Sequence, residues 1–320
     1  SPTHFLQRPS RWLKAITKYR ATYSGGPNFA FDFCAERIRE DELSEIDLSS
    51  LNCLYNGSEP IRPRTLRRFV ERFGRVGFSE KMIFTCYGLA EATLAVTTSK
   101  LGHFPKIVEV ATGELASCGV AYEDTTLRIV NPETEEICPE REEGEIWVSG
   151  ESVTSGYLNR PRETAETYVE VADSRFVRTG DLGFLLDNEL YVTGRIKDLI
   201  IIRGKNHYPH DIEQTVTGCA TSLKHDGCAA FSVDKDGEEQ LVIVQEIRRT
   251  HLQVVDIEHV LSLIAIEISH SHGLSPLDIV LVRPGTLPKT TSGKIQRGLC
   301  RKMWLEEQLN PIRNSGKLES

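Results

Sequence analysis

The apolar positions in the first third of the chain predict strands that alternate with helices. Short apolar runs at residues 21–23, 51–55 and 82–86 have the length of strands and end in turn-forming residues. After the first two runs, apolar residues recur at helical spacing, and a third helix is expected within residues 87–93. Three strand–loop–helix units in succession predict an α/β fold with helices packed on a parallel sheet.

The loops after these three predicted strands are candidates for one binding site. They cover residues 24–28, 56–60 and 87–91, and each contains glycine. Ligands of parallel sheets bind beyond the carboxyl ends of the strands, so the three loops should share one rim. A glycine there lets a ligand approach the backbone closely, although a tight turn would need it equally.

From about residue 108 the pattern changes to short apolar runs that are typical of an antiparallel sheet. Strands are expected at residues 126–130, 144–149, 176–178 and 190–193, separated by polar segments that contain proline or glycine. The sharpest turn of this β-rich part is expected at residues 178–183, where one carboxylate stands between two glycines.

Residues 194–213 predict the junction to a second domain. Charged residues flank an aliphatic run at residues 199–202, which is expected to form a buried strand. The run ends at a break over residues 203–206, and a helix that begins at a proline follows. Beyond it, helices and strands alternate to the end of the chain. The expected elements are a helix from residue 211, strands at 228–233 and 240–247, a helix at 256–270 and a strand at 278–282, which together indicate a small α+β domain.

Composition limits the partners. The 320 residues carry a net charge of -8 without a block of lysine or arginine, so no nucleic acid is expected as a partner. No apolar stretch approaches the roughly 20 residues that span a bilayer, so no transmembrane segment is expected. The eight cysteines form no Cys-x-x-Cys pair, which argues against a zinc ribbon and indicates buried thiols in a reducing cytoplasm. The chain begins at Ser1 without an initiator methionine, which indicates a fragment.

A lysine-containing loop at residues 287–297 could present a cation to a phosphate. Its Ser-Gly-Lys core resembles the end of a Walker phosphate loop. That motif requires glycine where Pro288 stands and serine or threonine where Ile295 stands, so we reject it. The alternatives are a lysine carried by a small polar loop to a phosphate held elsewhere, and an ordinary surface turn.

Four motifs occur in the order and spacing of the adenylate-forming superfamily of acyl, aryl and aminoacyl ligases and luciferase, and the chain resembles that superfamily. They lie at residues 87–91, 179–181, 194–198 and 288–294. Within the superfamily, residues 24–28, 56–60, 86–94 and 204–209 resemble the fatty acyl-AMP ligase branch. The resemblance implies activation of a fatty acid with ATP, followed by transfer to an acyl carrier protein of a polyketide or peptide synthase.

The resemblance also implies a role for individual residues. A fatty carboxylate is already ionised at neutral pH, so attack on the α-phosphate needs positioning and charge neutralisation and no general base. The implied assignments are Lys294 as the catalytic cation; Asp181 and Arg195 at the ribose; Tyr87, Gly88 and Leu89 at adenine, with Gly57, Ser58, Glu59 and Pro60 on its other side; Glu91 as a Mg²⁺ ligand; Gly26 and Asn28 at the acyl channel; and Lys197 as the hinge.

These assignments predict two domains. Residues 1–195 are expected to be the C-terminal part of a large adenylation domain, with an α/β part over 1–107 and a β-rich subdomain over 108–195. Residues 196–320 are expected to form a small mobile domain that rotates at Lys197.

Two departures from the family pattern keep other functions open. The family's phosphate loop should precede the first residue, so the chain alone is expected to be inactive in adenylation. The connection between residues 91 and 117 is shorter than the insertion that separates acyl-AMP from acyl-CoA ligases. The alternatives are therefore a long-chain acyl-CoA ligase and a non-catalytic module that binds an acyl-adenylate or a carrier protein.

Overall fold

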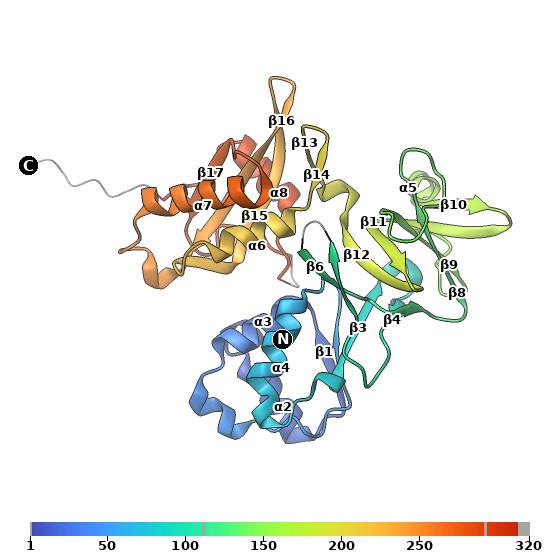
Figure 1. Cartoon of the computed structure of the whole chain (residues 1–320), viewed down its shortest axis with the longest axis horizontal. Helices are drawn as coiled ribbons and strands as arrows, with labels where there is room; N and C mark the ends of the chain where they lie inside the picture. The colour runs from blue at the N-terminus through green and yellow to red at the C-terminus, as the bar shows by residue number, and fades with distance from the viewer. Residues whose placement is uncertain (1, 111–112, 291–292, 313–320) are drawn as a thin grey trace, which may run out of the picture. The chain divides into compact units, whose positions relative to one another are not determined.

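The computed structural model describes residues 2–110, 113–290 and 293–312. The chain divides into two compact units, Ser1–Ile196 and Lys197–Ser320. That these units are part of a large adenylation domain and a small mobile domain stays a prediction. The first unit contains, with η for 3-10 helices, α1 (Pro2–Gln7), α2 (Ser10–Tyr19), β1 (Tyr23–Gly26), α3 (Asn28–Arg37), η1 (Glu40–Glu45), β2 (Cys53–Asn56), α4 (Pro63–Phe73), η2 (Gly74–Val76), η3 (Glu80–Met82), β3 (Ile83–Gly88), η4 (Ala90–Ala92), β4 (Ala95–Thr98), β5 (Ile107–Val110), β6 (Gly113–Ala116), β7 (Val120–Ala121), β8 (Thr125–Val130), β9 (Gly144–Gly150), α5 (Pro161–Thr167), β10 (Tyr168–Val171), β11 (Ser174–Leu186) and β12 (Glu189–Arg195) (Figure 1).

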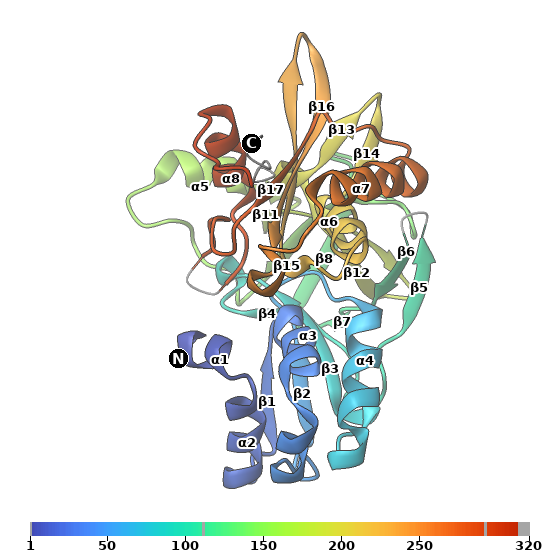
Figure 2. The ribbon, with the colours of Figure 1, turned by 90° about the vertical axis from the view of Figure 1, so that its left-hand side faces the viewer.

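A sheet of order β1-β2-β3-β4-β7 forms the first half of this unit. Its strands β1, β2 and β3 are parallel, as the sequence predicts, and α2, α3 and α4 lie along one face of them (Figure 2). The helices bury Leu13, Phe31 and Phe69 completely in the core. Because each helix places its apolar positions on one stripe, burial of that stripe against the sheet fixes which face of the helix points inward.

The prediction of a helix in the third strand–loop–helix unit is wrong. The segment directly after β3 contains no α-helix. A single 3-10 turn, η4, leads into β4, which pairs antiparallel to β3. The chain reverses at Thr93, whose φ of +65° lies in the left-handed region. This reversal returns the chain beside β3 and leaves no room for a crossover helix.

The β-rich part of the first unit is a second sheet of order β10-β11-β9-β8, with β12 paired to β11. The expected antiparallel pairing is confirmed. The predicted sharp turn at residues 178–183 is wrong, because these residues lie inside the long strand β11. The pairing of β11 with β9 shifts register between Arg178 and Leu182, so the glycines there mark a bulge.

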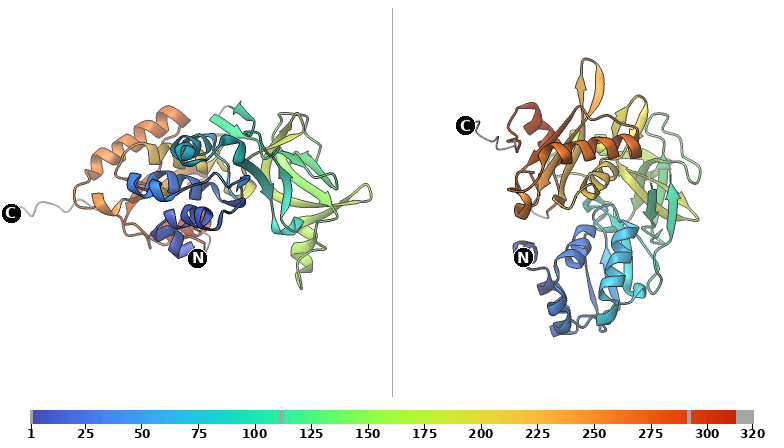
Figure 3. Two further views of the ribbon diagram at one scale, coloured as in Figure 1. Left: turned by 90° about the horizontal axis from the view of Figure 1, so that it is seen from below. Right: turned by 60° about the vertical axis from the view of Figure 1, so that its left-hand side comes forward.

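The second unit is a small α+β structure. Strand β15 pairs antiparallel to β16, and β16 pairs parallel to β17. Helices α6 and α7 pack beside each other against one face of this sheet, and α8 packs against the other (Figure 3). The unit begins within η5 (Ile196–Asp198) and continues through β13 (Ile200–Ile202), β14 (Lys205–His207), α6 (Pro209–Gly218), β15 (Leu223–Lys235), β16 (Glu238–Ile247), η6 (Arg249–His251), α7 (Ile257–His272), β17 (Asp278–Val282) and α8 (Arg297–Leu305).

The aliphatic run after the predicted hinge forms the expected strand, β13, but only one side of this strand is buried. β13 pairs with β14 in a hairpin whose turn lies at Arg203 and Gly204, both with positive φ. The side chain of Ile200 is buried, whereas that of Ile201, on the other side of the strand, is half exposed. The expectation of a fully buried strand is therefore wrong, while the helix that begins at Pro209 is confirmed.

The eight cysteines all lie in the described part of the chain and none forms a disulfide. Burial raises the pKa of each of these thiols, and the pKa of Cys118 reaches about 12. Along the described residues, none of the helices combines the length and the apolar character that crossing a membrane requires.

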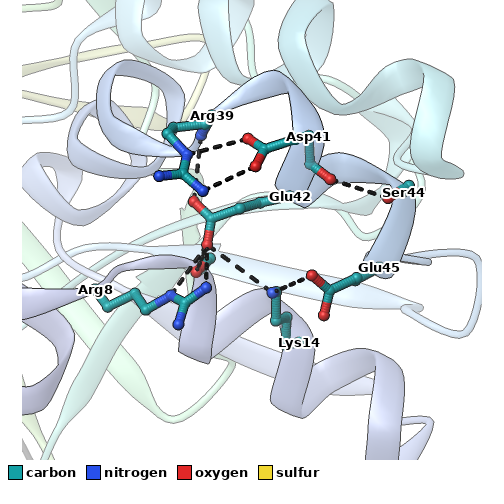
Figure 4. A network of polar contacts seen from close by, with 8 residues as sticks. Arg8, Lys14, Arg39, Asp41, Glu42, Ser44 and Glu45 are labelled. Carbon is teal, nitrogen blue, oxygen red and sulfur yellow. Dashed lines mark hydrogen bonds and ion pairs between the residues drawn. The ribbon is translucent and has the colours of Figure 1, made fainter.

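A buried carboxylate, Glu42, connects the start of α2 to η1 (Figure 4). Its Oε1 accepts hydrogen bonds from Ser10 Oγ at 2.8 Å and from Arg8 Nη2 at 2.9 Å. Glu42 is 7% exposed and Ser10 is fully buried. The hydrogen bond from Ser10 and the charge of Arg8 lower the pKa of Glu42 to about 2.

Glu42→Ala is expected to lower the free energy of unfolding by about 1–3 kcal/mol at pH 7, because Ser10 loses its acceptor in a buried site. The pKa of Glu42 in the folded protein lies below its usual value of 4.5. The ionised carboxylate therefore contributes its full stabilisation at pH values above 4.5. This contribution disappears as the pH falls from about 4.5 towards 2. Urea unfolding at pH 7, 4.5 and 3 measures the difference, which should shrink at the lowest pH.

Asp41→Ala is the matched control for this carboxylate. Asp41 lies on the same 3-10 helix, but it is exposed and pairs with the exposed Arg39. An equal loss of stability in both variants would show that burial of Glu42 is irrelevant.

Candidate functional site

The carboxylate of Asp181 is the centre of the polar cluster in the first unit. Tyr87 donates its hydroxyl hydrogen to Asp181 Oδ2 at 2.8 Å. Arg195 Nε donates to Asp181 Oδ1 at 2.5 Å. All three residues are predicted from the sequence to bind the nucleotide, and the structure brings them together from β3, β11 and β12.

The bulge in β11 gives Asp181 its direction. Gly180 adopts a φ of +68°, which a residue with a side chain rarely takes, and its N–H donates to Glu145 Oε1 at 3.0 Å. The hydroxyl of Thr179 donates to Ile146 O at 2.7 Å and accepts from the N–H of Asp181. These contacts fix the two residues before Asp181 to β9, so the carboxylate projects at the place where β11 departs from regular pairing.

The protonation of Tyr87 suits its role as a donor. The residue is buried, and burial together with the neighbouring carboxylate of Asp181 raises the pKa of Tyr87 well above its usual value. Its hydroxyl therefore keeps its proton at neutral pH. Arg195 is largely exposed, so its guanidinium can donate to Asp181 and to a ligand.

The predicted adenine loop, which follows β2, packs tightly on β3. A Cβ atom at Gly57 would lie 2.7 Å from Cys86 Sγ and 2.9 Å from Cys86 O, so a larger residue would force the loop away. Ser58 has a φ of +69°, and the carboxylate of Glu59 accepts a hydrogen bond from the N–H of Phe29. Glu59 therefore ties this loop to the start of α3; the adenine role of residues 57–60, Gly88 and Leu89 stays a prediction.

Asn28, predicted for the acyl channel, is a structural connector in the first unit. Its side chain is buried and donates to Thr65 Oγ1 at 3.1 Å. Its oxygen accepts from the N–H of Arg62 at 3.1 Å. Gly26 lies nearby, at the end of β1. An acyl-binding role of Asn28 and Gly26 stays a prediction.

Glu91, the predicted Mg²⁺ ligand, has a hydrogen-bond partner that no motif in the sequence indicates. Tyr157 donates its hydroxyl to Glu91 Oε1 at 2.5 Å, across 66 positions of sequence. Burial and the Glu91 carboxylate raise the pKa of Tyr157 to about 12, which keeps it a donor. Within the described ranges, no cluster of three or more His, Cys, Asp or Glu could hold a metal by protein ligands alone.

Lys294 and Lys197 lie in the second unit. Lys294 lies in a short hairpin that is closed by an antiparallel β-bridge between Lys289 and Ile295. The backbone carbonyl of Lys294 accepts a hydrogen bond from the N–H of Thr290 at 2.8 Å. Two residues of the predicted lysine loop, 291 and 292, lie outside the described residues. Lys197 is exposed in η5, where the second unit begins. The catalytic role of Lys294 and the hinge role of Lys197 stay predictions.

Comparisons with known proteins match both units. The model of the AMP-binding enzyme family matches residues 1–158. A model described as Disco-interacting protein 2-like, AMP domain, matches residues 197–314.

Curated relatives match nearly the whole chain. The chain is 42% identical over 334 residues to the medium-chain-fatty-acid–[acyl-carrier-protein] ligase JamA of Moorena producens, covering 97% of the chain and 56% of JamA. It is 40% identical over 336 residues to the long-chain-fatty-acid–AMP ligase FadD23 of Mycobacterium tuberculosis, covering 98% of the chain and 57% of FadD23. The chain thus spans little more than half the length of these relatives.

The fold matches a solved structure from a study of fatty acyl-adenylate ligases from E. coli and L. pneumophila. The TM-score is 0.85 at 33% sequence identity, and the match covers 95% of this chain and 56% of the other. The two family models, the relatives and this match together show that the chain is similar to the fatty acyl-AMP ligases of the AMP-binding enzyme family.

Proposed function

We propose that the protein activates a fatty acid with ATP to an acyl-adenylate and pyrophosphate, and then transfers the acyl group to the phosphopantetheine of an acyl carrier protein. The relatives' names give the substrate class: JamA is a fatty-acid–[acyl-carrier-protein] ligase and FadD23 a fatty-acid–AMP ligase. We further propose that the carrier belongs to a polyketide or peptide synthase and that the protein works in the cytoplasm.

The arrangement around Asp181 is the observation that carries this proposal. Each carboxylate oxygen offers two lone-pair sites, and the contacts with Tyr87 and Arg195 occupy one on each oxygen. One acceptor site per oxygen is left for the two vicinal hydroxyls of a ribose. Because Tyr87 and Arg195 hold the carboxylate in one orientation, it can bind the ribose without first losing side-chain entropy.

The first reaction step needs an in-line approach of the fatty carboxylate to the α-phosphate and neutralisation of the charge that accumulates there. Lys294 supplies the cation in this proposal. Its hairpin supports such a role, because a short hairpin closed by its own hydrogen bonds presents a side chain with little loss of freedom.

Glu91 fits a Mg²⁺ site that the substrate completes. Its Oε1 is held by Tyr157, so the carboxylate is oriented towards one side. Mg²⁺ in nucleotide enzymes is commonly bound by one or two carboxylates together with phosphate oxygens and water, so a single protein carboxylate is sufficient. The ion would there neutralise phosphate charge.

The first prediction about activity concerns Lys294→Ala in the full-length protein. We expect fatty-acid-dependent ATP–pyrophosphate exchange to fall at least about 100-fold, because a charge-stabilising group that acts in the transition state is lost. Lys302→Ala, which removes an exposed lysine of the same unit, is the control and should retain activity.

The acceptor is tested with the same preparation. The acyl group should pass to a phosphopantetheinylated carrier protein and leave free coenzyme A unacylated. Rapid thioester formation with coenzyme A would assign the protein to the acyl-CoA ligases, and a complete lack of adenylate in the wild type would favour a binding module.

A second prediction concerns Tyr87→Phe. The change removes the hydroxyl that donates to Asp181 and preserves the ring, so kcat/KM for ATP should fall about tenfold, as expected for one hydrogen bond to a charged group. Tyr191→Phe is the matched control, because Tyr191 is a buried tyrosine of the same unit whose ring stacks on Phe184. An equal effect of both substitutions would show that the loss comes from general destabilisation.

A further inference from the structure

Arg297 joins three elements of the second unit through one guanidinium group. Its Nε and Nη2 donate to the two carboxylate oxygens of Glu213 at 2.7 and 2.8 Å. Its Nη1 donates to Asp198 Oδ2 at 3.0 Å. Arg297 is the first residue of α8, Glu213 lies on α6 and Asp198 ends η5. Asp198 directly follows Lys197, and Arg297 stands three positions after Lys294. The hydrogen bond between them therefore links the Lys197 junction to the Lys294 hairpin.

Burial makes this contact rigid. Glu213 is 7% exposed, and its Oε1 also accepts from the N–H of Ala230 on β15 at 3.1 Å. A planar guanidinium that donates two parallel hydrogen bonds to a carboxylate fixes both distance and orientation. Burial lowers the pKa of Arg297, but the Glu213 and Asp198 carboxylates raise it by more. The net pKa of Arg297 lies above its usual value, so the guanidinium stays charged.

The other end of the lysine hairpin has its own buried anchor. Glu246 is completely buried, and its Oε1 accepts from the N–H groups of Gly285 at 2.7 Å and Leu287 at 3.0 Å. Lys289 Nζ then donates to Asp226 Oδ2 at 2.8 Å. These contacts hold the incoming strand of the hairpin to β15 and β16. They do not reach η5, whereas Arg297 does.

We propose that Arg297 is a positioning residue that holds the Lys294 hairpin and Asp198 as one rigid body, so that Lys294 keeps a fixed place relative to the Lys197 junction. This inference rests on the catalytic role proposed for Lys294. Any rotation at Lys197 then carries Asp198, Arg297 and Lys294 together. Without the contact to Asp198, the hairpin remains attached to the sheet but its position relative to the junction varies.

Asp198→Ala in the full-length protein tests the proposal, because alanine cannot accept the hydrogen bond from Arg297. Removal of Arg297 itself would leave Glu213 as a buried unpaired charge and could prevent folding. Asp198 is one-third exposed, and its replacement leaves the Arg297–Glu213 pair intact. We expect kcat for fatty-acid-dependent adenylation to fall about tenfold, because small misplacements of a catalytic group are costly, while KM for ATP changes less than twofold.

A double-mutant cycle shows whether Asp198 acts through Lys294. In the Lys294→Ala background, Asp198→Ala should change the residual adenylation rate less than twofold, because the group that Asp198 positions is already absent. An unchanged tenfold loss in that background would overturn the proposal. If the wild type forms no adenylate, the proposed function fails first, and the cycle then has no rate to compare.

Hydrogen exchange separates these two failures, because it requires no activity. The amides of residues 293–297 should exchange faster in Asp198→Ala than in the wild type, since the outgoing strand of the hairpin loses its contact with η5. Asp278→Ala is the matched control: it removes the hydrogen bond that Asp278 accepts from Trp304 Nε1 at the far end of α8, away from η5. Equal exchange of these amides in Asp198→Ala and Asp278→Ala would show that the Asp198 contact does not hold the hairpin.

Discussion

The bulge in β11 is the constraint on which the candidate site depends. Regular antiparallel pairing would continue the alternation of side chains through residues 178–182, and the register shift there breaks it. The shift is stable because Glu145, which is buried in β9, accepts from the N–H of Gly180 and from Arg178. Asp181 can then meet Tyr87 of the other sheet. One buried carboxylate thus determines where a second carboxylate is presented.

In the second unit, too, buried carboxylates determine where functional side chains are presented. Buried charges are tolerated only where every one of them is paired, and both Glu213 and Glu246 meet this condition through several donors each. Each of these carboxylates holds one end of the Lys294 hairpin. The loop that carries the proposed catalytic cation is therefore fixed by carboxylates that never touch a substrate in this scheme.

The sequence predicts local structure well and long-range contacts poorly. Helix α4, the helix that begins at Pro209 and the strand β17 follow from apolar spacing, because local periodicity decides them. The helix expected after residue 87 fails because an antiparallel return competes with a crossover, and nothing in residues 87–93 distinguishes the two. The resemblance to the adenylate-forming superfamily identifies Tyr87, Asp181 and Arg195, which the structure brings together. Tyr157 and Arg297 have partners 66 and 84 or more positions away, and no pattern in the linear sequence indicates them.

The state of the cysteines has a practical consequence for studying the junction between the units. A thiol reacts with alkylating reagents as the thiolate, and burial raises the pKa of all eight native thiols, so they should react slowly near neutral pH. Lys197 is exposed. A cysteine introduced beside it would carry a fluorophore selectively, without prior removal of the native cysteines, and would report on the orientation of the two units in solution.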